Sequence, residues 1–116
     1  MKLTQNVQVQ IPKYILILIN NLFEIQKKIG ANDDNLNIGR NMIKIIEALE
    51  DQGLTFENPL GQRFNQTRAD LEATISGEGT ENLIVVDVLK PIIRMGNTNN
   101  SVIVQKGIVI VETFKE

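Results

Sequence analysis

The sequence contains no cysteine, no histidine and no tryptophan, and its 116 residues include only one tyrosine. Without a thiolate or an imidazole, the chain lacks the groups used by hydrolases of the triad type, and it also lacks disulfides and the ligands of ordinary zinc sites. The missing cysteine fits a reducing compartment, so we expect a cytoplasmic protein. We expect no cofactor and no bound metal.

The chain also lacks a strong charge of one sign and a long apolar run. Its 12 basic and 14 acidic residues give a net charge of −2, so no overall positive field would hold a nucleic acid. The apolar run at residues 14–19 is far shorter than the roughly 20 residues that cross a bilayer, and no small-residue cleavage site follows it. We therefore expect a soluble, unprocessed protein that binds neither nucleic acid nor membrane.

The first half of the chain has the pattern of two helices. Residues 1–10 alternate polar and apolar side chains and are either a short strand or a tail. From Pro12, apolar residues recur at spacings of four and three, which predicts a helix that ends near Gly30. Tyr14 and Ile17 make this helix apolar on further sides, so more than one neighbour must cover it.

A second amphipathic helix is expected at residues 37–52, after a run of turn-forming residues, and Gly53 would end it. The short connection predicts an antiparallel helical hairpin. A hairpin of this kind cannot by itself cover both faces of its first helix.

The second half of the chain has the pattern of short strands. Residues 54–56, 71–76, 83–89, 92–95, 102–104 and 108–111 are the predicted strands. Turn-forming residues separate them at 58–61, 77–79 and 96–100. The fold class is therefore α+β, with a helical hairpin at 1–53 followed by a small, mostly antiparallel β domain at 54–116.

The residues where the second helix ends resemble a known family. A helix ending before Gly-Val, then Pro-Leu-Gly, two further residues and Phe is the pattern of GrpE, the nucleotide exchange factor of DnaK-type chaperones. This chain is similar to it at Gly53, Leu54, Pro59, Leu60, Gly61 and Phe64. With the order of helices and strands on either side, the resemblance extends over residues 14–113.

The resemblance implies a homodimer in which the helical hairpins of two copies form a four-helix bundle. The first helix is apolar around most of its circumference, and this independently favours such a dimer. The expected interface residues are Ile15, Leu18, Leu22, Ile25, Met42, Ile46 and Leu49. The β domain would bind the ATPase domain of the chaperone and promote ADP release, a co-chaperone function that is not enzymatic.

The residues expected to contact that partner lie in the β half: Arg63, Lys90, Arg94, Gln105 and Lys106. Scattered surface charge is the simpler interpretation of these cations. Two arginines of the family's later Arg-x-Leu-Arg-Pro-Ala-Met-Val strand have no counterpart at residues 102–109, and the chain lacks the family's long N-terminal stalk helix. These departures favour an alternative, a dimeric adaptor with a different partner and no exchange activity.

A third hypothesis is a small enzyme built on three acidic residues. Asp70 and Glu72 would point to one side of a strand, and Asp87 interrupts an apolar strand. Paired carboxylates can serve acid–base chemistry, but a catalytic site also needs a pocket and positioning groups that the sequence does not indicate. For Asp87 we expect a solvent-facing position, with a buried ion pair to Lys90, Arg94 or Lys106 as the second interpretation.

Overall fold

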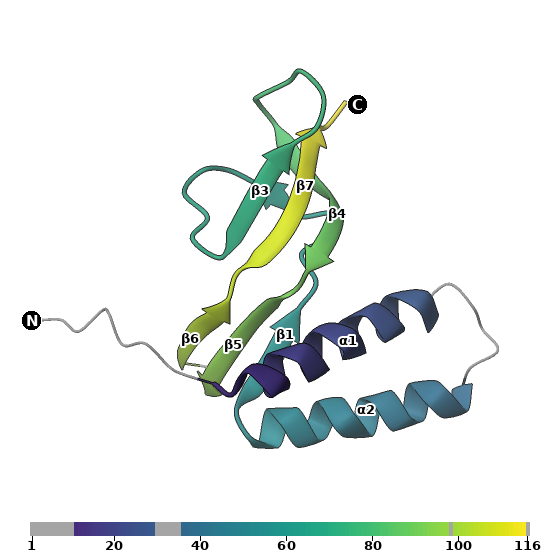
Figure 1. The fold of residues 1–116 in the computed structure, drawn as a ribbon. Coiled ribbons are helices and arrows are strands. Elements are labelled where there is room, and N and C mark those ends of the chain that lie inside the picture. The colour runs from purple at the N-terminus through teal and green to yellow at the C-terminus, as the bar shows by residue number, and fades with distance from the viewer. Residues whose placement is uncertain (1–10, 30–35, 98, 116) are drawn as a thin grey trace, which may run out of the picture.

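The two predicted helices are present in the computed structural model, which describes residues 11–29, 36–97 and 99–115. Helix α1 spans Lys13–Ile29 and helix α2 spans Leu36–Asp51, and they run side by side in opposite directions (Figure 1). Pro12 precedes α1, and its carbonyl accepts the amide of Ile15 at 3.0 Å. After α2, Gly53 adopts a φ of 82°, the left-handed conformation for which glycine is suited. The prediction for residues 1–10 lies outside the described residues.

Seven strands follow within the described residues, arranged in two sheets. Sheet one has three strands in the order β1-β5-β6, and sheet two has four in the order β2-β4-β7-β3. The strands are β1 (Leu54–Glu57), β2 (Arg63–Phe64), β3 (Leu71–Ile75), β4 (Leu83–Lys90), β5 (Ile92–Asn97), β6 (Asn100–Gln105) and β7 (Gly107–Thr113). Six of these match predicted segments, whereas β2 was not predicted. The α+β fold class with mostly antiparallel strands is thereby confirmed.

One long bent ribbon connects the two sheets. Strands β4 and β5 are nearly continuous, with Pro91 between them, and β6 continues into β7 after Lys106. In sheet one β5 pairs with β6, and in sheet two β4 pairs with β7, all antiparallel. Pro91 has no N–H for a ladder, so it lies at the bend where the ribbon passes from one sheet to the other. Residues 105–107, between β6 and β7, are therefore where the chain passes from one sheet to the other.

Strand β3 departs from the antiparallel pattern. It pairs in parallel with β7, from Leu71 opposite Gly107 to Ile75 opposite Val111. The connection from β3 to β7 contains three other strands, so the pairing joins segments far apart in the sequence. Gly107 lies close to its neighbours here, because a Cβ added to it would lie 2.8 Å from the Leu71 side chain and 2.9 Å from that of Ile92.

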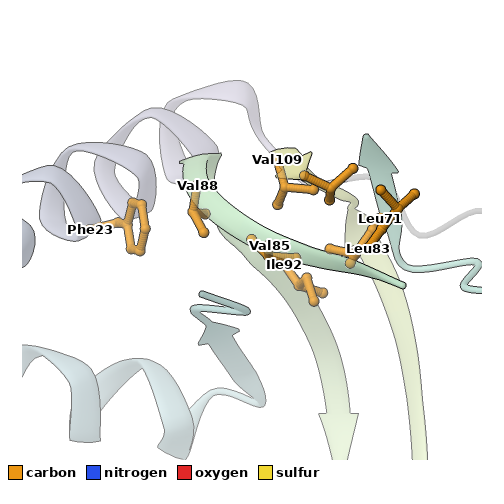
Figure 2. Packing of buried hydrophobic residues seen from close by; sticks show 8 residues of the cluster. Phe23, Leu71, Leu83, Val85, Val88, Ile92 and Val109 are labelled. Carbon is orange, nitrogen blue, oxygen red and sulfur yellow. The ribbon is translucent and has the colours of Figure 1, made fainter. Parts of the chain in front are cut away.

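Helix α1 contributes to both hydrophobic clusters of the β half. Phe23 packs in one cluster with Val85 and Val88 of sheet two and with Ile92 at the start of β5, as Figure 2 shows. Four residues earlier, Ile19 packs with Leu54 and Ile93 of sheet one. The same face of α1 thus packs against both sheets, since residues four apart lie on one side of a helix. Among the described residues, no helix is long and apolar enough to cross a membrane.

Candidate protein interfaces

An open apolar groove lies between the two helices and ends on sheet one. Its volume is about 550 Å³. We call it the helical groove; it is lined by Ile15, Leu18, Ile19, Asn21, Leu22, Ile25, Ile45, Leu49, Gln52, Leu54 and Met95. Apolar side chains around it remain in contact with water: Leu18 is 63% exposed, Ile25 46% and Ile45 49%.

The structure brings five of the seven predicted interface residues together in this groove: Ile15, Leu18, Leu22, Ile25 and Leu49. Leu22 is nevertheless mostly buried within its own chain. Met42 is also buried, and Ile46 is half-buried outside the lining. Sequence reasoning missed Ile45, which the spacing from Met42 and Leu49 could have identified, and it missed Leu54 and Met95, which only the tertiary fold brings to the groove.

Helix α1 carries further exposed apolar side chains beside the groove. Tyr14 is 63% exposed and Ile17 is 53% exposed. Tyr14 lies four residues before Leu18, and Ile17 lies four residues before Asn21, so both continue this surface along α1. Exposed apolar patches of this kind mark interaction surfaces, because soluble monomers rarely leave contiguous apolar area uncovered.

Two of the five predicted partner contacts, Gln105 and Arg94, form hydrogen bonds within the chain. Gln105 donates to the carbonyl of Pro91 at 3.0 Å and to Asn20 Oδ1 at 2.9 Å, and Asn20 donates back to Gln105 Oε1 at 3.0 Å. This amide pair joins α1 to the bend of the ribbon. Lys27 at the end of α1 adds a second polar link, since its Nζ donates to the carbonyl of Val88 at 2.9 Å.

Arg94 belongs to an ionic network between β1, β5 and the segment before β3. It forms ion pairs with Glu57 at 2.5 Å and with Asp70 at 3.2 Å. Arg68 donates two hydrogen bonds to the same Asp70, from Nε at 3.0 Å and from a terminal nitrogen at 2.9 Å. The network ties the 58–70 connection to the sheet.

The same contacts perturb the titration of Asp70. The hydrogen bonds from Arg68 lower the pKa of Asp70, and they outweigh partial burial, which acts in the opposite direction. The positive charges of Arg68 and Arg94 lower the pKa further. In turn, the hydrogen bond with Asp70 raises the pKa of Arg68. Asp70 is therefore a paired structural anion at neutral pH.

The acidic residues of the enzyme hypothesis do not form one cluster. Asp70 is engaged by two arginines, and Glu72 is exposed on β3. Asp87 is exposed as expected, on β4, and strand β7 separates β4 from β3. Its carboxylate accepts the amide of Val88 at 2.9 Å. No cluster of three or more acidic residues suited to a metal ion is found in the described part of the chain.

The outward face of sheet two forms a second surface. Two β-bulges in β4, at Val85/Asp87 and Val88/Lys90, each place two β4 residues opposite one residue of β7. The additional residues include Val86 and Leu89, which are both exposed.

Directly paired residues share a face, so the register assembles this surface. We call it the outer sheet face; its members are Arg63, Glu72, Thr74, Ile84, Val86, Asp87, Leu89, Lys90, Ile108, Ile110 and Glu112. On the inner strand β7, Ile108 lies between Lys90 and Glu72, and Ile110 lies between Asp87 and Thr74, so apolar and charged side chains alternate across this face. Arg63 and Lys90, two predicted partner contacts, lie on it, whereas Lys106 is exposed at the bend.

Comparisons with known protein families, with curated proteins and with solved structures find no match to this chain.

Proposed function

We propose that this protein is a homodimeric, GrpE-like nucleotide exchange factor that acts on a DnaK-type chaperone through its β half. The observation that carries the proposal is the apolar surface of the helices, which the chain's own β half leaves uncovered. One face of α1 packs on the sheets through Ile19 and Phe23, while Leu18 and Ile25 face water. A second copy offers the same surface and can cover it.

The size of that surface supports a dimer. Tyr14, Ile17, Leu18, Ile25, Ile38 and Ile45 are each between 46% and 63% exposed. At about 180 Å² for a fully exposed residue of this size, they present roughly 580 Å² of surface. A standard interface buries about 800 Å² on each partner, so these side chains with their polar margin supply most of it. In the proposed assembly the hairpins of two copies form a four-helix bundle.

The residues of the GrpE-like pattern have clear local roles, which supports the resemblance. Gly53 and Gly61 adopt φ values of 82° and 84°, where side chains other than hydrogen are strained. The carbonyl of the buried Pro59 accepts the amide of Gln62 at 3.0 Å, and Gly61 donates to the carbonyl of Val85 at 2.9 Å. These residues dock the turn after β1 on strand β4, so the pattern describes a structural requirement of this fold.

The outer sheet face is the surface that we assign to the chaperone. It combines exposed apolar side chains, Val86 and Leu89, with charged ones, and interfaces between proteins have this mixed composition. An exchange factor acts by binding the open form of the chaperone more tightly than the closed form, and by linkage it then weakens nucleotide binding by the same factor. Couplings of this kind are typically about 1 to 3 kcal/mol, or roughly 5- to 150-fold.

The test is the rate at which a labelled ADP leaves the ATPase domain of a DnaK-type chaperone from the same source. We expect micromolar protein to accelerate release. Leu89→Asp should abolish the acceleration because it replaces an exposed apolar side chain of the outer sheet face with a charge. Ile43→Asp, on an exposed position of α2 outside the helical groove, is the matched control and should retain it. An unchanged release rate with no complex formation would refute the exchange function.

The alternative is an adaptor that dimerises in the same way but binds a different partner. The internal contacts of Arg94 and Gln105 favour it, because they occupy two side chains that the resemblance assigned to the chaperone. This alternative expects a dimer without any effect on nucleotide release, so the same assay separates the two functions.

A further inference from the structure

Asn21 is a polar residue in the middle of the exposed apolar surface of α1. Residues three and four apart are neighbours on a helix, so Ile17, Leu18 and Ile25 surround it. Each of those three side chains is about half exposed or more. Asn21 also lines the helical groove.

The amide of the adjacent residue, Asn20, has its hydrogen-bond partners within the chain. Asn20 exchanges two hydrogen bonds with Gln105 and is half-buried. Asn21 lies about 100° further around α1, where its Nδ2 donates to the carbonyl of Ile17 at 2.8 Å. Among the hydrogen bonds of residues 11–29, 36–97 and 99–115, its Oδ1 accepts none, so the amide oxygen and the second N–H remain available.

The spacing around Asn21 is that of a helix–helix seam. Tyr14, Leu18, Asn21 and Ile25 follow one another at intervals of four, three and four, which is the heptad spacing of coiled-coil packing. In such seams a single asparagine at a core position selects the register and the number of helices, at a cost in stability. The alternative pairings would leave its amide buried without a partner, which is unfavourable.

We infer that Asn21 lies at the two-fold axis of the homodimer, where it pairs with Asn21 of a second copy and specifies the alignment of the helices. This inference rests on the proposed dimer. Apolar contacts alone have little directional preference. Asn21 would therefore be the residue that selects one alignment of the two helices in an otherwise apolar interface. A contact between the same residue of both copies is expected at the axis of an isologous interface.

The first experiment locates Asn21 in the dimer. Because the chain has no cysteine, each introduced cysteine is unique. Asn21→Cys should form a covalent dimer under mild oxidation, since a disulfide requires Cα atoms within about 7 Å. Gln26→Cys is the matched control, because Gln26 is exposed on the same helix but lies about 140° around its axis. Equal cross-linking of both variants, or of neither, would overturn the inference.

The second experiment tests specificity. Asn21→Leu should lower the dissociation constant about tenfold, because it removes a polar group from the seam, and it should add larger assemblies to the dimer in sedimentation velocity. A variant that stays strictly dimeric and binds itself more weakly than wild type contradicts the role. Wild-type sedimentation separates the two levels of failure: a monomer at high concentration refutes the proposed dimer itself, whereas a dimer without cross-linking at residue 21 refutes only the place of Asn21.

Discussion

Leu18→Asp tests whether the exposed side of α1 is an interface. Fully burying a leucine contributes about 1.5 to 3 kcal/mol, and Leu18 is still 63% exposed in the single chain. Covering it in a dimer would therefore contribute about 1 to 2 kcal/mol per copy, or about 2 to 4 kcal/mol across a two-fold interface. An aspartate in its place would also have to be desolvated, at a further cost. We expect the dissociation constant to rise by more than about a hundredfold.

The same substitution should leave the fold of the single chain intact. Changes at exposed positions usually alter the free energy of unfolding by less than about 0.5 kcal/mol. Sedimentation velocity over a range of concentrations measures the dimer, and urea unfolding at the lowest concentration measures the chain alone, since association adds to apparent stability. Leu22→Asp is the contrasting variant: Leu22 is only 7% exposed, so this change should unfold the protein.

Two results would refute this reasoning. A Leu18→Asp protein that forms the proposed dimer as readily as the wild type would show that the exposed side of α1 is not the contact surface. A Leu18→Asp protein as unstable as Leu22→Asp would show that Leu18 is covered within its own chain. Ile43→Asp controls for the added charge, because Ile43 is 55% exposed but lies outside the helical groove.

Three further predictions concern the single chain. Phe23→Ala should lower the free energy of unfolding by about 3 to 5 kcal/mol in a urea titration, because Phe23 fills the core where α1 meets sheet two, and no change would contradict that packing. Asp70→Asn should lower the free energy of unfolding by about 2 kcal/mol at neutral pH, measured by urea titration. Since the folded-state pKa of Asp70 is lowered, this contribution is present above about pH 4 and is lost as the pH falls through the folded-state value, so the two proteins should converge in acid; a constant difference would contradict the ion pair. Gly39→Ala should raise the thermal midpoint, because nothing lies within 4 Å of the new methyl group in α2, whereas Gly107→Ala should lower it by forcing Leu71 and Ile92 aside; equal shifts would contradict the packing at the bend.

The elements of the fold were largely predictable because they depend on local chemistry. The spacing of apolar residues in α1 and the glycine after α2 are signals that act within a few residues. The ends of both helices lie within one residue of the expected positions. The β-branched segments likewise formed strands. Strand β2 was missed because two residues carry no periodicity, and it is defined by the pairing of Arg63 with Ile84 and of Phe64 with Leu83.

The candidate interfaces were predictable only in part. Leu18 and Ile25 follow from helical spacing, and they face water as an interface between copies would require. Arg94 and Gln105 look like surface groups in the sequence, but their partners Asp70 and Asn20 lie 24 and 85 positions away along the chain. The outer sheet face was missed because the bulges of β4 shift its side chains out of simple alternation.

By itself, the sequence determined which segments are helix and strand, and it ruled out chemistry that needs cysteine or histidine, because side-chain identity and short-range spacing are local properties. Only the tertiary structure decided that β3 pairs in parallel with β7, that Phe23 belongs to the core of sheet two, and which side of α1 stays uncovered. The reason is physical: α1 is apolar on several sides, and which of them meets the sheets depends on contacts with residues more than thirty positions away, which no local pattern records.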